Sequence, residues 1–212
     1  MNKTFSLIIL FLLPAAIVSG QNDPKAISVL DKFSLKASSA PSVSMKFLFV
    51  RNDQVQKSID TVAGSVVLSK DSYRLDLPDN IIWYNGMTSW SFLPAEDEVT
   101  VSEPDRKDNS FESRPSMIFN MYKDGYKCRL LEEKSDSYLI DLYPTDIKNE
   151  IIRVRLLIAK PSLDLKSFEY KMRDGVVITL TVNEYSIVRT PAAGFFEFDP
   201  SKHRGVEIID MR

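Results

Sequence analysis

Apolar residues follow a helical period in two short segments and alternate with polar residues along most of the remaining chain. The segment 24–36 follows Asp23 and opens with Pro24, which favour the N-cap and the first turn of a helix. Its apolar residues recur at helical spacing: Ala26, Ile27, Leu30 and Phe33. A second segment, 115–122, carries Met117, Ile118, Met121 and Tyr122 on one helical face. We therefore expect helices over 24–36 and 115–122.

Outside these segments the apolar residues recur at every second position, which is typical of strands with one buried face. The clearest set is Val43, Met45, Phe47 and Phe49. A turn is expected at 51–53, and hairpin tips at Asn85-Gly86 and Asp174-Gly175. Later candidate strands are 126–132, 137–143, 150–158, 165–173, 176–188 and 195–198. The pattern predicts one antiparallel sheet of roughly nine to eleven strands, curled into an open barrel with the two helices across its mouth.

The net charge and the N-terminal residues limit the classes of protein to which this chain can belong. The chain has 27 Lys and Arg against 29 Asp and Glu, a net charge of -2, so it offers no broad basic surface for nucleic acid. Lys3, an apolar run over 5–16 and small residues before Gln21 are typical of a secretory signal peptide. We expect residues 1–20 to be removed and residues 21–212 to form a single soluble domain without an attached lipid.

The residues that usually carry catalysis or bind metals are scarce. Cys128 is the only cysteine and His203 the only histidine, so a disulfide within the chain and a zinc site are both excluded. We interpret Cys128 as a half-buried strand residue and His203 as a solvated loop residue. A Ser-His-Asp triad would have to use His203, and no phosphate-binding loop is present. We expect no cofactor, no metal and no catalytic activity.

The segment 81–94 resembles the central block of the periplasmic outer-membrane lipoprotein carrier family, the LolA family. An apolar strand and the Asn85-Gly86 turn are followed at the family's spacing by Thr88, Trp90, Phe92 and Pro94. The closing residues Phe196, Phe198, Pro200 and Gly205 are similar to the family's C-terminal pattern. Gly64, which opens the strand leading to Lys70, fits the same family.

This resemblance implies an incomplete, half-open β-barrel whose helices form a lid over an apolar cavity. It also implies a periplasmic carrier of acylated lipoproteins, loaded by an inner-membrane transporter and emptied by an outer-membrane acceptor, without covalent chemistry. Lys70 stands where the family carries an arginine tied to closing the lid, and lysine lacks the planar bidentate fork of arginine. The alternatives are a sensor or regulator on the same fold that binds lipid or a partner protein, and a small secreted esterase.

Strand and helix spacing predicts which side chains line a shared interior. They are Met45, Phe47, Phe49, Leu75, Trp90, Phe92, Ile118 and Met121. An ordinary packed core has the same pattern, so spacing leaves open whether these residues fill a core or surround a ligand. A monomer is expected.

Overall fold

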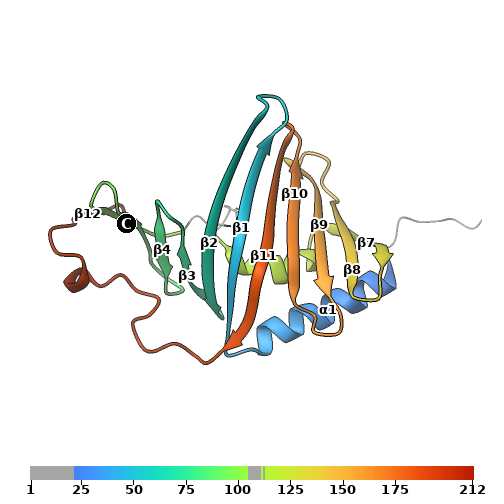
Figure 1. Ribbon diagram of the computed structural model, residues 1–212, viewed down its shortest axis with the longest axis horizontal. Helices are drawn as coiled ribbons and strands as arrows, with labels where there is room; N and C mark the ends of the chain where they lie inside the picture. Colours follow the sequence, from blue (N-terminus) through green and yellow to red (C-terminus); the bar gives the residue numbers. More distant parts are fainter. Residues whose placement is uncertain (1–21, 105–110, 112) are drawn as a thin grey trace, which may run out of the picture.

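Twelve strands form one strongly curved sheet in the computed structural model, which describes residues 22–104, 111 and 113–212 (Figure 1). The expected signal peptide, 1–20, lies outside the described residues. The N-terminal part contains α1 (Pro24–Ser39), β1 (Ser42–Asp53), β2 (Ser58–Ser69), β3 (Ser72–Asp76), β4 (Ile81–Tyr84), β5 (Ser89–Leu93) and β6 (Glu98–Ser102). The remainder contains η1 (Pro115–Phe119), η2 (Met121–Lys123), β7 (Tyr126–Glu133), β8 (Ser137–Pro144), β9 (Ile151–Ala159), β10 (Leu165–Met172), β11 (Val176–Val188), η3 (Pro200–Lys202) and β12 (Glu207–Asp210).

The strands lie side by side in the order β12-β6-β5-β4-β3-β2-β1-β11-β10-β9-β8-β7. Every neighbouring pair is antiparallel except β12 and β6, which are parallel. The two end strands, β12 and β7, do not pair within the described part of the chain, so the sheet stays open. The predicted open antiparallel sheet is therefore confirmed, with twelve strands instead of nine to eleven; the parallel pair of β12 and β6 was not predicted.

The hairpin of β1 and β2 extends beyond the turn expected at 51–53. Those residues continue β1, and the connection lies at 54–57. The Asp53 carboxylate accepts the N–H groups of Val55 (3.1 Å) and Gln56 (2.9 Å), and Lys57 takes a left-handed conformation with φ of 55°. A carboxylate that caps the turn in this way lets the polar sequence 51–53 remain in the strand.

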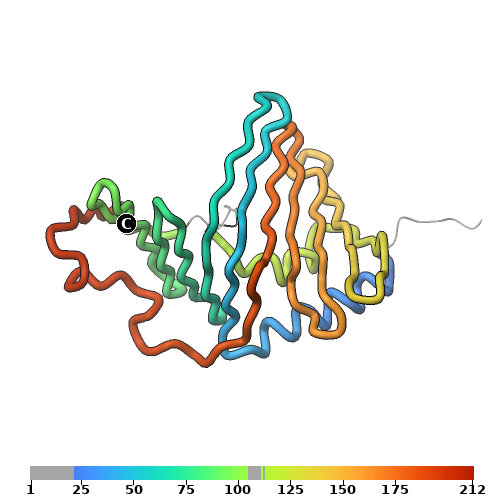
Figure 2. Tube along the Cα trace, in the orientation of Figure 1, coloured from blue at the N-terminus to red at the C-terminus, as the bar shows by residue number. Residues whose placement is uncertain are grey.

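The C-terminal segment departs most from prediction. The expected strand over 195–198 is wrong, because these residues form turns after Gly194, which has φ of 79°. Residues 189–206 instead leave the end of β11 and run beside β2–β4 to the far edge of the sheet (Figure 2). There β12 joins β6, with the Glu207 N–H donating to the Asp97 carbonyl at 2.8 Å.

Both expected helical segments are present, but only the first is an α-helix. Asp23 caps α1, which runs three residues further than predicted. The segment 115–122 forms two 3-10 turns, η1 and η2, separated at Asn120 (φ -128°, ψ -14°). So few residues between Pro115 and Gly125 cannot offset the cost of an α-helical nucleus, and 3-10 turns are the usual short connectors. Within the described residues, no helix combines the length and the hydropathy needed to cross a bilayer.

Candidate functional site

One face of the sheet, here called the inner face, carries a continuous apolar surface. Met45 on β1 lies opposite Val66 on β2, Val66 opposite Leu75 on β3, and Leu75 opposite Ile82 on β4. Residues directly opposite each other on paired strands share a face, and all four side chains are buried. The same surface continues through β11 to β8 with Leu180, Phe168, Leu156 and Ile140.

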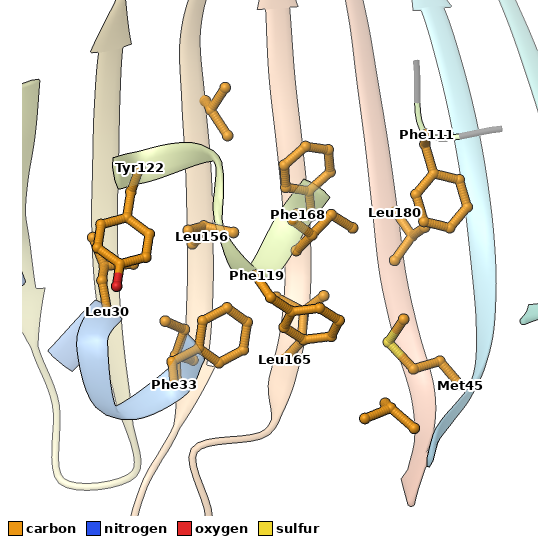
Figure 3. Packing of buried hydrophobic residues seen from close by; sticks show 14 of the residues in the cluster. Leu30, Phe33, Met45, Phe111, Phe119, Tyr122, Leu156, Leu165, Phe168 and Leu180 are labelled. Carbon is orange, nitrogen blue, oxygen red and sulfur yellow. The ribbon is translucent and has the colours of Figure 1, made fainter. Parts of the chain in front are cut away.

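A separate cover, formed by α1 with η1 and η2, lies over part of the inner face. Leu30 and Phe33 of α1, Phe119 of η1 and Tyr122 of η2 lie over the strand residues beneath them, which include Leu156 and Leu165 (Figure 3). The Phe33 and Phe119 rings pack with their centroids 5.1 Å apart. The apolar interior is thus bounded by the sheet on one side and by this cover on the other.

Hydrogen bonds join the two parts of the cover to each other. The Ser34 hydroxyl of α1 donates to Asn120 Oδ1 at 2.8 Å, and the Tyr122 hydroxyl donates to Asp31 Oδ1 at 2.6 Å. Burial, together with the bond to Asp31, raises the pKa of Tyr122 to about 12, so the phenol stays a neutral donor at ordinary pH. The cover therefore behaves as one connected unit.

Polar contacts tie α1 to the outlying parts of the sheet. Asp23 caps the helix with one carboxylate oxygen, and its other oxygen accepts the Leu130 N–H of the edge strand β7 at 3.2 Å. The Asp23 N–H also donates to the Cys128 carbonyl at 3.0 Å. At the other end, Lys36 pairs with Asp164 and donates to the Ser162 carbonyl at 2.7 Å. Between these ends, α1 meets the inner face mainly through apolar side chains.

Six of the eight residues predicted to line the interior belong to it or border it. Met45, Phe47, Leu75 and Ile118 are fully buried members of the main apolar cluster. Phe49 and Met121 are half-buried and pack against that cluster. In the described conformation these side chains fill the interior.

Trp90 and Phe92 are a correction, because they lie on the opposite face of the sheet. Trp90 pairs with Trp83, and Phe92 with Ile81, whereas the inner-face residue Ile82 pairs with Ser91. Phe92 packs in a second cluster with Trp83, Val99 and Phe198, and Trp90 is half-buried against it. The C-terminal segment covers this outer cluster, so the apolar side of β5 exists as predicted but belongs to the outer face of the sheet.

Phe47 is held by a close fit to Gly64 on the neighbouring strand. The two residues are cross-strand partners, and a β-carbon on Gly64 would lie only 2.8 Å from Phe47 Cζ and 2.7 Å from Leu77 Cδ2. The Phe47 ring also meets Phe111 edge to face, with centroids 5.4 Å apart. Glycine at position 64 therefore creates the space in which the Phe47 ring lies.

Gly64→Ala is expected to destabilise the protein by about 1–3 kcal/mol, because the added methyl must displace a fully buried ring. Urea unfolding measures the loss. Ser65→Ala, on the other face of the same strand, is the matched control and should stay within about 0.5 kcal/mol of the parent. A Gly64→Ala variant as stable as the parent would show that Phe47 is loosely packed.

Lys70 lies at the turn between β2 and β3, where it is exposed and has φ of 52°. Within the described residues its side chain forms no hydrogen bond or ion pair. It borders an open groove of about 790 Å³ between the ends of the strands and the C-terminal segment, which Ser38, Gly86 and Phe196 also line. Lys70 thus lies outside the apolar interior, and its gating role remains only a prediction.

Three contributors to the interior were not predicted. Phe111 lies in a polar stretch where the sequence favours a loop, yet its side chain is buried against Phe47. Phe119 packs on Phe33, although it did not belong to the helical face expected for 115–122. Tyr185 on β11 faces the same interior from beside Met45. Only Phe111 had a sequence signal for burial, because it is a large apolar residue isolated in a polar stretch.

A polar pocket of about 700 Å³ adjoins the interior near the start of η1. Tyr73, Tyr84, Ser113 and Arg114 are among the residues that line it. Tyr73 is also buried in the main cluster, and its ring lies 5.4 Å from that of Tyr84. The lining suits the polar portion of an amphiphilic ligand better than a hydrocarbon chain.

The lone cysteine and histidine have different surroundings from those expected. Cys128 is fully buried, and this burial raises the pKa of its thiol to about 11, so it is a neutral packing residue. His203 lies in a loop as predicted, but its ring is half-buried and stacks on Phe198 with centroids 4.9 Å apart. His203 therefore packs over the outer cluster and is only partly exposed to solvent.

Residues 24–176 match a protein family described as "outer membrane lipoprotein carrier protein LolA". No curated protein sequence matches the chain significantly. Among solved structures, an uncharacterized conserved protein from Thermus thermophilus has a TM-score of 0.58 at 11% identity, covering 88% of this chain and 99% of that chain.

Two further solved structures match with lower TM-scores. A LolA superfamily protein from Nitrosomonas europaea has a TM-score of 0.43 at 13% identity, covering 81% of this chain and 97% of that chain. LprF from Mycobacterium bovis has a TM-score of 0.45 at 10% identity, covering 81% of this chain and all of that chain. The family match to residues 24–176 spans well over half of the chain, and this protein therefore belongs to the LolA family of outer membrane lipoprotein carrier proteins.

Proposed function

We propose that this protein is a periplasmic carrier that holds the acyl chains of lipoproteins in its apolar interior. It receives its cargo from an inner-membrane lipoprotein-releasing transporter and delivers it to an outer-membrane acceptor. The observation that carries the proposal is the apolar inner face of an open sheet, covered in part by the separate elements α1, η1 and η2. Export through the signal peptide at 1–20, and action of 21–212 as one monomeric domain, are parts of the same proposal.

The way the cover attaches supports reversible loading. Lifting it separates apolar surfaces and leaves the backbone ladder of the sheet intact, because no strand of the sheet belongs to the cover. Each buried CH₂ group of an acyl chain contributes about 0.8 kcal/mol, so one long chain supplies ample driving force. The acyl chain must replace side chains that now fill the interior. The net binding free energy is therefore the difference between two apolar packings. A small difference suits a carrier that must release its cargo.

Lipid extraction and probe uptake test this proposal directly. Mass spectrometry of organic extracts of the purified protein should detect acylated molecules, and a fluorescent acyl probe should bind saturably. A synthetic triacylated lipopeptide should displace the probe, whereas the same peptide without acyl chains should not. Absence of both extracted lipid and saturable probe binding would contradict the proposal.

Delivery separates a carrier from a sensor that binds lipid or a partner on the same fold. A carrier is expected to take a labelled lipoprotein from inner-membrane vesicles into solution and release it to acceptor vesicles. A sensor would bind the acyl probe and retain it, and a small esterase would cleave a chromogenic acyl ester. Cleavage, or binding without any transfer, would favour the corresponding alternative.

A further inference from the structure

Tyr185 places a hydroxyl group inside the apolar interior without a hydrogen-bond partner among the described residues. It lies opposite Met45 in the pairing of β11 with β1 and therefore shares the inner face with that buried side chain. The residue as a whole is half-buried, but its hydroxyl oxygen is fully buried and forms no hydrogen bond with any described residue. The hydroxyl end of the ring thus points inward.

The two fully buried tyrosines of the main cluster, Tyr73 and Tyr122, both have hydrogen-bonded hydroxyls. Tyr122 donates to Asp31 at 2.6 Å, and Tyr73 donates to the Ser113 carbonyl at 3.1 Å. A buried hydroxyl that lacks a partner costs free energy, which phenylalanine at the same position would avoid. A tyrosine at position 185 is therefore better explained by a polar group that reaches the interior than by packing.

Tyr185 has both charged and apolar neighbours. Lys36, in the last turn of α1, lies with its Nζ 4.9 Å from the centre of the Tyr185 ring and pairs with Asp164. Burial raises the pKa of Tyr185 far above its usual value, and the nearby negative charge of Asp164 adds to this, so the phenol keeps its proton. A charged pair, a neutral O–H donor and the buried apolar side chain of Met45 thus lie close to one another.

An acylated amphiphile combines groups that suit these neighbours: a polar head, carbonyl groups that only accept hydrogen bonds, and hydrocarbon chains. We propose that the Tyr185 hydroxyl donates a hydrogen bond to an acyl ester carbonyl of the bound lipid. The head group then lies near Lys36 and Asp164, and the chains continue beneath α1. This inference rests on the proposed function and adds the residue beside which an acyl chain begins.

Tyr185→Phe tests the inference, with two lipids that differ only in their carbonyl groups. The probes are dipalmitoylglycerol and its ether-linked dihexadecyl analogue, each measured by displacement of a fluorescent acyl probe. The parent should prefer the ester on the order of tenfold, the value of one well-buried hydrogen bond. Tyr185→Phe should lose this preference through weaker ester binding, with ether binding unchanged and a melting temperature at or above that of the parent.

Tyr143→Phe is the matched control, because Tyr143 lies on the outer face, where its hydroxyl donates to Asp141 at 3.0 Å. It should retain the preference of the parent for the ester. An ester-to-ether ratio that is the same in Tyr185→Phe and the parent would overturn this inference alone. Failure of the parent to bind either lipid would overturn the proposed function, and the inference with it.

Discussion

Phe47→Ala is expected to lower the free energy of unfolding by about 3–5 kcal/mol, the usual cost of removing a buried aromatic ring. The side chain is 1% exposed and lies between Gly64, Leu77 and Phe111. A residue that lined a permanently open cavity would already be partly unpacked and would cost less. Urea unfolding measures the loss, and a value of about 1 kcal/mol would indicate an interior that is open without lipid.

Phe47→Glu distinguishes a role of Phe47 in the packed core from a role in lipid binding. If the cover opens, water can reach a carboxylate at position 47, so some folded protein should remain while uptake of the acyl probe is lost. Phe92→Ala is the matched control, because Phe92 lies in the outer cluster beneath the C-terminal segment. It should destabilise the protein yet leave probe uptake unchanged. Complete unfolding of Phe47→Glu would assign Phe47 to the core alone.

Asp141→Ala should be comparably destabilising, by about 3–5 kcal/mol, because it leaves a partly buried arginine without its counter-ion. The Asp141 carboxylate is 1% exposed and accepts two hydrogen bonds from Arg155, at 2.7 and 2.9 Å. These bonds raise the pKa of the Arg155 guanidinium above its usual value. Residues Asp141 and Arg155 are cross-strand partners on β8 and β9, so the pair also joins two strands on the outer face of the sheet.

Replacing both Asp141 and Arg155 distinguishes the loss of the ion pair from the cost of leaving one charge unpaired. The double variant Asp141→Leu with Arg155→Leu should recover most of the stability lost in Asp141→Ala, because no buried charge is left unpaired. Chemical unfolding at neutral pH measures both variants. A double variant less stable than Asp141→Ala would mean that the pair itself stabilises the sheet.

Much of the inner face could be predicted because strand periodicity is local. Alternation in 43–49 places Met45, Phe47 and Phe49 on one side of a strand, and the structure keeps them together. Trp90 and Phe92 alternate equally well in β5, but four strand pairings separate β5 from β1. Alternation shows which side of a strand is apolar. The register of every intervening strand pair decides which face of the sheet that side joins.

The sequence alone determined the elements whose physics is local: the helix capped by Asp23, the alternating strands and the glycine turns near Gly86 and Gly175. It also carried the family motifs over 81–94. The tertiary structure decided what depends on distant neighbours. The C-terminal segment covers the outer cluster, Phe111 folds onto Phe47, and the Tyr185 hydroxyl is buried without a partner among the described residues. No period in a sequence encodes these contacts, because each joins segments that the chain brings together only when the sheet has formed.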